Sequence, residues 1–290
     1  MAKNISPKTA RRLLKMQQDE MDSYEIYRRV ARRLDGTNRD LMEKIAEDEL
    51  EHAFIWSKYT GIVLKGRMWK VHLMVFLSRI LGFTFITRYL ERGEHHAIVR
   101  YLSLESEIPE AVTVRLDEES HELMLIGALD EKRLRYVGSM VLGLNDALVE
   151  LTGTLVGFTF ALRDAWLVAL SGLIAGLAAA FSMASSAYLS ARADGNKDSR
   201  ACALYTGVMY LIVVALLVLP YMLVPRESSL TALGIMLLIV VAIITVFNYY
   251  LAVAKNQPFK RRFLEMFVVC LVITLLSFGF GTLGKFLISG

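Results

Sequence analysis

The sequence predicts an all-α protein of two domains, a charged four-helix bundle in residues 1–135 and a five-helix membrane domain in residues 136–290. Residues 1–135 carry 23 Lys/Arg and 22 Asp/Glu, whereas residues 136–290 carry only 10 and 7. All five histidines lie in the first part, and Cys202 and Cys270 lie in apolar runs of the second. This division excludes a simple soluble enzyme, a disordered protein and a disulfide scaffold. No long Lys/Arg run indicates a nucleic-acid interface.

The first domain is expected to contain four amphipathic helices joined by short connections, as in a helix bundle. Pro7 opens a helical pattern that runs to Asp35, and Gly36 is the predicted stop. Further patterns predict a second helix over about 38–60 and a third over about 84–103. A fourth helix starts near Pro109, and we expect it to run directly into the first membrane span.

Two copies of the motif Glu-x-x-His make this bundle a candidate metal-binding domain. Glu49 and His52 form the first copy, and Glu118 and His121 form the second. Positions i and i+3 share a helix face, so each copy offers one carboxylate oxygen and one imidazole nitrogen to the same point. A single copy arises easily by chance in a charged helix, but the doubled motif favours a binding site.

Each motif follows a helix with a further candidate carboxylate, Glu20 in one half and Glu94 in the other. Tyr27 and Tyr101 come seven residues after these glutamates, on the same helix face, and are expected to surround the ligands. Glu91 competes with Glu94 for the ligand role. Four carboxylates and two histidines predict a di-iron or di-manganese carboxylate centre, with zinc as another option.

Five apolar stretches in the second domain are each long enough to cross a bilayer core of about 30 Å. They are 136–162, 166–191, 201–224, 228–254 and 263–289. The N-terminal residues are polar and lack the apolar segment of a signal peptide, and the basic residues of the loops cluster on one side. We therefore expect a multi-pass protein of the cytoplasmic membrane, with the first domain in the cytoplasm and the C-terminus outside.

Two acids, Asp146 and Glu150, lie in the middle of the first span. They are four residues apart and share one helix face. Because ionised carboxylates are costly inside a bilayer, we expect them to face a cation path, with a structural polar pair as the alternative. Met183 in the second span offers a thioether ligand, although methionine in membrane helices more often serves packing.

The connection over residues 62–83 combines basic residues with an apolar run that His72 and Arg79 interrupt. This composition predicts either a helix that lies in the membrane interface or a dimer contact. A sixth span is less favoured, because Arg79 would lie at its centre.

On these residues, the first domain resembles the rubrerythrin-type ferritin-like domain, and the second resembles the vacuolar iron transporter family. The second resemblance rests on Gly143-Leu-Asn-Asp146 with Glu150 in the first span, and on Ser182-Met183 through Tyr188-Leu-Ser190 in the second. The combination is similar to the bacterial membrane-bound ferritins, which join these two modules. The resemblance implies a homodimeric antiporter that exports Fe²⁺, with Mn²⁺ as an alternative cargo, in exchange for protons.

The resemblance also implies the residues that carry metal. For the transport path these are Asp146, Glu150 and Met183. For a di-iron centre they are Glu20, Glu49, His52, Glu94, Glu118 and His121. Two features depart from the transporter pattern: Ser186-Ala187-Tyr188 stands where relatives commonly have Gly-Glu-Tyr, and only residues 192–200 stand where eukaryotic relatives carry a Glu-rich insert. We expect Glu150 to replace the missing carboxylate and the bundle to replace the insert.

The sequence thus favours proton-coupled export of Fe²⁺ by a protein whose bundle collects, senses or oxidises the metal. The alternative is a membrane-anchored di-iron oxidase, ferroxidase or peroxidase whose spans only anchor it, and a storage protein is a third option. Five spans exceed what an anchor needs, and the sequence has no Cys-x-x-Cys electron donor. Ferroxidase activity that accompanies transport stays open, so the sequence does not decide whether the protein is an enzyme.

Overall fold

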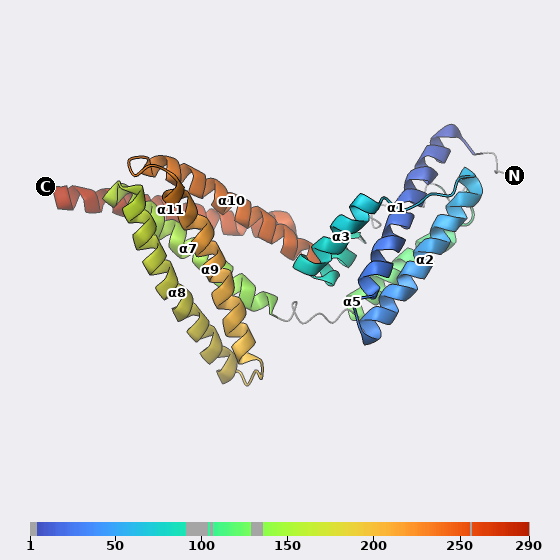
Figure 1. The fold of residues 1–290 in the computed structure, drawn as a ribbon, viewed down its shortest axis with the longest axis horizontal. Coiled ribbons are helices and arrows are strands. Elements are labelled where there is room, and N and C mark those ends of the chain that lie inside the picture. Colours follow the sequence, from blue (N-terminus) through green and yellow to red (C-terminus); the bar gives the residue numbers. More distant parts are fainter. Residues whose placement is uncertain (1–4, 91–103, 105–106, 129–135, 256, 290) are drawn as a thin grey trace. The chain divides into compact units, whose positions relative to one another are not determined.

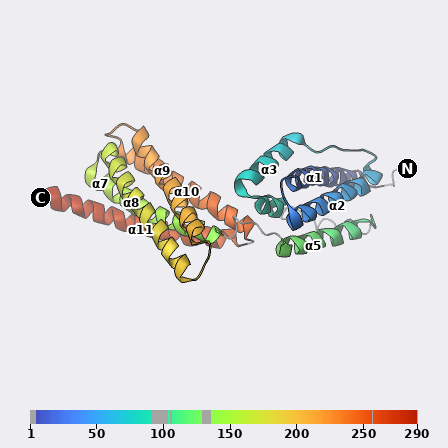
Figure 2. The same cartoon turned by 60° about the horizontal axis from the view of Figure 1, so that its bottom comes forward.

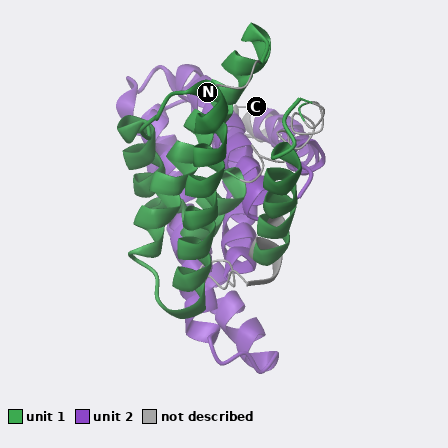
Figure 3. Ribbon diagram, turned by 90° about the vertical axis from the view of Figure 1, so that its right-hand side faces the viewer, with its two compact units in different colours: residues 1–131 green, residues 132–290 purple. Residues whose placement is uncertain are grey.

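The computed structural model describes residues 5–90, 104, 107–128, 136–255 and 257–289 (Figure 1). These residues form helices joined by turns and loops, with no strand among them. The chain divides into two compact units, Met1–Glu131 and Lys132–Gly290 (Figure 3). The prediction of an all-helical chain with five helices long and apolar enough to cross a membrane is confirmed.

The first unit is built around helices α1 (Pro7–Ala31) and α2 (Gly36–Thr60), which pack side by side (Figure 1). Ser6 caps α1 by accepting a hydrogen bond of 3.1 Å from the backbone N–H of Thr9. The prediction that this helix runs to Asp35 is wrong, because α1 ends at Ala31 and a short turn follows. Gly36 has a positive φ of 57° and opens α2, so it serves the chain reversal between the two helices.

Two further helices flank this pair (Figure 2). Helix α3 (Met68–Leu81) lies against α1, and α5 (Ala111–Ala128) lies against α2. Of the predicted third helix, residues 84–90 are helical, and the remainder, 91–103, lies outside the described residues. The predicted continuation of the fourth helix into the first span falls on residues 129–135, which also lie outside them.

The hydrophobic packing in this unit holds α1, α2 and α5 together. One cluster joins α1, α2 and α5 with the segment that precedes α5, and it fixes the start of α5 against α2. Its buried members are Leu13, Met16, Ile55, Trp56, Tyr59, Leu104, Ile108, Ala111 and Val114. Burying large apolar side chains of this kind contributes about 1.5–3 kcal/mol each, so the cluster helps to hold the polar residues of the same helices in place.

The second unit contains the five candidate spans. They are α7 (Val137–Leu162), α8 (Ala165–Ala193), α9 (Ser199–Leu223), α10 (Ser229–Ala254) and α11 (Phe259–Ser289). Helix α7 packs against α8, α9 and α11, while α8 and α9 form a closely packed pair (Figure 1). Helix α7 also contacts α10, so it touches all four of the other spans, and it carries the two acids singled out in the sequence.

Helices α7 and α9 approach most closely at Gly143. A Cβ atom on Gly143 would lie 2.2 Å from the backbone oxygen of Thr206, so only glycine permits this contact. The hydroxyl of Thr206 donates to the backbone oxygen of Ser139 at 3.1 Å, which ties the same two helices together one turn earlier. This contact positions the segment of α7 that contains Asp146.

Candidate metal centre and membrane site

Four of the predicted ligands come together inside the first unit. Glu20 from α1, Glu49 and His52 from α2, and Glu118 from α5 each offer a ligand atom, and these atoms lie within 4.8 Å of one another. All four side chains are buried, with at most 3% of any residue exposed. Three helices thus deliver carboxylates and an imidazole to one point away from solvent.

His121 joins the same cluster from α5. Its Nδ1 lies 3.6 Å from Glu118 Oε2 and 3.9 Å from Glu49 Oε1, and the His52 and His121 ring centroids are 6.0 Å apart. His52 Nδ1 lies 3.1 Å from Glu118 Oε1. Both Glu-x-x-His motifs therefore converge, and both rings present Nδ1 to the carboxylates.

Two aspartates that sequence reasoning missed hold the outer nitrogens of these rings. Asp48 Oδ2 lies 2.9 Å from His121 Nε2, and Asp117 Oδ2 lies 3.3 Å from His52 Nε2. Each aspartate directly precedes the motif glutamate on its own helix but contacts the histidine of the opposite motif. The signal in the sequence was that both copies read Asp-Glu-x-x-His. A carboxylate on the outer nitrogen fixes the ring orientation and tautomer, as is usual for histidines that bind metals.

The charges of this cluster are strongly coupled. Burial alone lowers the pKa of His52, but the contact with Glu118, its charge and that of Glu20 outweigh burial and raise the pKa to about 9. Burial raises the pKa of Glu118, yet the contacts with His121 and His52 outweigh it and hold the pKa at about 2. Burial and the charge of Glu118 raise the pKa of Glu20. The buried carboxylates thus stabilise positive charge on the neighbouring imidazole. A divalent cation bound among them would supply this positive charge in place of the proton.

The indole of Trp56 is a further neighbour that the sequence did not reveal. Its Nε1 donates to Glu20 Oε1 at 3.3 Å from one turn after His52, and its side chain is fully buried. The predicted neighbour Tyr27 is buried on α1. The remaining predictions for this site, Glu91, Glu94 and Tyr101, lie outside the described residues.

The donor set could hold a divalent metal ion of the iron or manganese type. The three buried carboxylates offer hard oxygen ligands, and the two imidazoles, once deprotonated, offer borderline nitrogen ligands. Ions of this type prefer such a combination. The paired Glu-x-x-His motifs on α2 and α5 match the arrangement used in bundles that bind two metal ions. Manganese and zinc suit the same ligands, so the donor set does not select one metal.

The second unit brings its two acids onto one face of α7. Asp146 is partly buried, and Glu150 is exposed on the surface of the chain one helical turn later. The hydroxyl of Tyr210 on α9, which is fully buried, donates to Glu150 Oε2 at 2.7 Å. Sequence reasoning missed Tyr210, because it lies 60 positions away in an apolar span. This hydrogen bond gives the Glu150 carboxylate a polar partner on the neighbouring helix.

Met183 has a different setting. Its side chain is partly buried and packs against the hydrophobic core of the second unit. This placement agrees with the packing alternative that the sequence left open, and a ligand role for the thioether remains a prediction.

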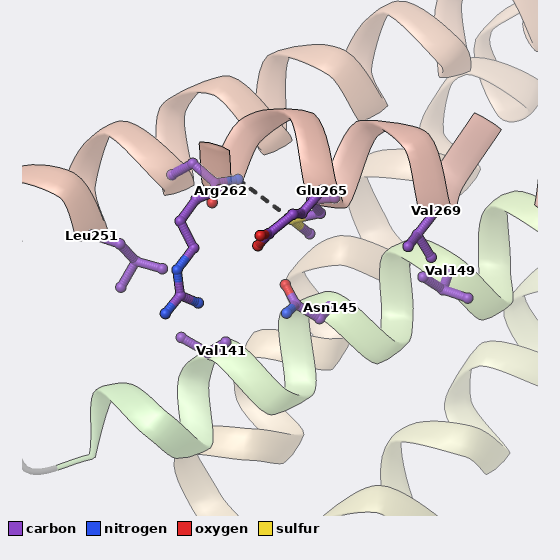
Figure 4. Close-up of a pocket in the computed structure, with 9 residues that line it drawn as sticks. Val141, Asn145, Val149, Leu251, Arg262, Glu265 and Val269 are labelled. Carbon is purple, nitrogen blue, oxygen red and sulfur yellow. Dashed lines mark hydrogen bonds between the residues drawn. The ribbon is translucent and has the colours of Figure 1, made fainter. Parts of the chain in front are cut away.

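A cavity of about 220 Å³ with both apolar and polar lining residues lies among α7, α10 and α11. Asn145 points from α7 towards the Glu265 carboxylate of α11, and Arg262 reaches towards Val141 (Figure 4). The Oδ1 atom of Asn145 is buried and has no hydrogen-bond donor within the described part of the chain. The cavity therefore contains two acceptor groups, Asn145 Oδ1 and the Glu265 carboxylate, and Asn145 directly precedes Asp146 on α7.

Five helices long and apolar enough to cross a membrane indicate a multi-pass membrane protein. The family model described as the VIT family, of vacuolar iron transporters, matches residues 137–199. This region comprises α7 and α8, with Asp146, Glu150 and Met183, and its similarity supports membrane transport of metal ions such as iron or manganese. Neither the curated proteins nor the solved structures include a significant match to the chain.

Proposed function

We propose that the protein exports Fe²⁺, with Mn²⁺ as a second cargo, in exchange for protons. The observation that carries the proposal is that the VIT family match covers the span with Asp146 and Glu150. Oxygen ligands bind both ions, and a carboxylate that takes up a proton loses its hold on a cation. Proton entry from the opposite side of the membrane would therefore release the metal from this face of α7.

The path is proposed to lie between two copies of the chain. Glu150 is exposed on the single chain, although it belongs to a helix of membrane-spanning length. Because exposure of a carboxylate to lipid is costly, such residues face a protein interior or a water-filled cavity. A homodimer that faces its two α7 helices towards each other would enclose Asp146 and Glu150 from both copies.

The proposed orientation of the chain in the membrane rests on the loop charges. Arg192, Lys197 and Arg200 lie in or beside the α8–α9 loop, and Lys260, Arg261 and Arg262 lie at the start of α11. The α7–α8 and α9–α10 loops hold only Arg163 and Arg226. The backbone N–H of Ala165 donates to the backbone oxygen of Arg226 at 2.8 Å, so these two poorly charged loops meet at one end. The positive-inside rule then places the bundle in the cytoplasm of a cytoplasmic-membrane protein.

The bundle is proposed to collect, sense or oxidise the metal before transport. Glu20, Glu49 and Glu118 would bind a pair of iron ions together with His52 and His121, and Glu94 is proposed as the fourth carboxylate. Asp48 and Asp117 orient the two imidazole rings, and the low exposure of the ligands excludes water from the site. A di-iron centre held in this way supplies one-electron redox chemistry with oxygen or peroxide.

The test is Fe²⁺ flux into proteoliposomes under an imposed pH gradient. Asp146→Asn keeps the size of the side chain but removes its charge, and we expect it to abolish gradient-driven flux while iron binding to the bundle persists. Asp194→Asn, the same change at an exposed residue after α8, is the matched control and should transport normally. Equal flux from wild type and Asp146→Asn would disprove the proposed path.

The alternative proposal is a membrane-anchored di-iron oxidase, ferroxidase or peroxidase, which the buried three-carboxylate, two-histidine cluster favours. Oxygen uptake on addition of Fe²⁺ would reveal such activity, and Glu49→Gln should remove it. Uptake without any gradient-dependent flux would favour the anchored enzyme. Flux with no uptake would favour a collecting or sensing bundle.

A further inference from the structure

Helix α3 has one buried and one exposed apolar face. Val71 and Val75 are buried, and α3 packs on α1. On the opposite side, four large apolar residues are exposed by 67%, 44%, 55% and 57%. They are Trp69, Leu73, Phe76 and Ile80. Their spacing of four, three and four residues aligns them in one stripe along the helix.

Polar contacts fix this helix in place. Asp22 on α1 accepts hydrogen bonds from the backbone N–H of Arg67 at 2.7 Å, from Arg67 Nε at 2.9 Å and from Lys70 Nζ at 3.0 Å. Arg33 donates to the backbone oxygen of Val75 at 3.3 Å. The exposed stripe therefore belongs to a helix that is anchored at its start and along its buried side.

Positive charge accompanies the stripe. Residues 62–81 contain four Lys/Arg and no Asp or Glu. On the helix, His72 and Arg79 border one edge of the stripe and Lys70 borders the other. A stripe of Trp, Phe, Leu and Ile with basic edges is typical of helices that lie in the headgroup layer of anionic membranes.

The chain length keeps a membrane within reach of this surface. Helix α5 ends at Ala128 and the first span begins at Val137. The residues between them can extend by at most about 30 Å. The lipid headgroups therefore stay near the first unit at all times, which raises their effective concentration far above that of a free partner.

We propose that the exposed face of α3 binds the anionic headgroup layer of the membrane that the second unit spans. Its apolar side chains insert at the level of the headgroups, while His72 and Arg79, at the edge away from Lys70, contact lipid phosphates. A second copy of the chain is the less favourable occupant, because it would bring equally basic edges against each other.

The test measures depth with nitroxide labels on the full chain in vesicles. Cys202 and Cys270 are first replaced by Ala, and single cysteines are then introduced by Leu73→Cys, Phe76→Cys and, as the control, Arg39→Cys on the exposed face of α2. In vesicles of phosphatidylcholine with phosphatidylglycerol, we expect the labels at 73 and 76 to collide readily with oxygen and poorly with a water-soluble nickel chelate. The label at 39 should show the reverse.

Three outcomes would overturn the proposal. A label at 73 that meets the nickel chelate as readily as the label at 39 would show that the stripe faces water. Protection from both reagents, with spin–spin broadening between copies, would show a second copy on the stripe. Equal depth in purely zwitterionic vesicles would refute the role of anionic lipid. Trp69→Glu, which changes an exposed residue, should return the label at 76 to water without unfolding the unit.

Discussion

Replacing Asp48 by Asn is expected to weaken metal binding by the bundle about 10- to 100-fold, the usual effect of removing a carboxylate behind a histidine ligand. Asp48 Oδ2 lies 2.9 Å from His121 Nε2, while Nδ1 of the same ring faces Glu49 and Glu118. Asn keeps the shape and an acceptor oxygen but removes the charge that makes the imidazole a stronger ligand. The loss corresponds to about 1.4–2.7 kcal/mol of binding free energy.

The companion change Asp117→Asn should have a smaller effect. Its contact with His52 Nε2 is longer, at 3.3 Å, and its side chain is 47% exposed against 32% for Asp48, so solvent screens it more. The assay is an anaerobic competition titration of the full chain in detergent with Fe²⁺ and a fluorescent chelator. Asp40→Asn, at an exposed position of α2, is the matched control. If Asp48→Asn bound metal with wild-type affinity, the contact between Asp48 and His121 of the opposite motif would play no part in metal binding.

Two further predictions concern stability and are measured by thermal unfolding of the full chain in detergent. Gly143→Ala should destabilise the second unit by about 3 kcal/mol or more, because its Cβ would meet the Thr206 backbone, whereas Gly138→Ala has open space and should be neutral. Melting temperatures equal to wild type at both positions would contradict the close α7–α9 contact. Asp22→Asn should cost the first unit about 1.5–3 kcal/mol, since it weakens charged hydrogen bonds to Arg67. Burial raises the pKa of Asp22, but those bonds lower it overall. Its contribution is therefore complete above the ordinary Asp pKa of about 4 and is lost as pH falls through the lower folded value. A difference between mutant and wild type that does not shrink as the pH falls would argue against this explanation.

Hydrophobic length and helical periodicity were enough to predict the helices and the five spans, because membrane-spanning helices leave a long local signal. The end of α1 was not predictable in this way. The pattern continued to Asp35, but the reversal into α2 required the turn to begin after Ala31. The hydrophobic pattern within α1 does not predict where the chain must turn so that α2 can pack against it.

The metal cluster was partly predictable for a related reason. The i, i+3 spacing placed Glu49 with His52 and Glu118 with His121, and bundle topology brought Glu20 to the same point. The crossed contacts of Asp48 and Asp117 depend on how α2 and α5 are aligned, which no single helix encodes. The Tyr210–Glu150 hydrogen bond was equally hidden, because it joins two spans through their packing.

The cluster joins positions that are far apart along the chain, from Glu20 on α1 to Glu118 on α5. A metal ion bound there acts as a cross-link that closes a loop of about 100 residues, so its binding free energy adds directly to folding free energy. At a free metal concentration 100 times the dissociation constant, the added stability is about 2.7 kcal/mol. The resistance of the first unit to unfolding, and hence to proteolysis, then becomes a readout of the metal concentration around it. Withdrawal of the metal would loosen the attachment of α5, since, among the helices that the structure describes, α5 joins the cluster from the far end of the loop.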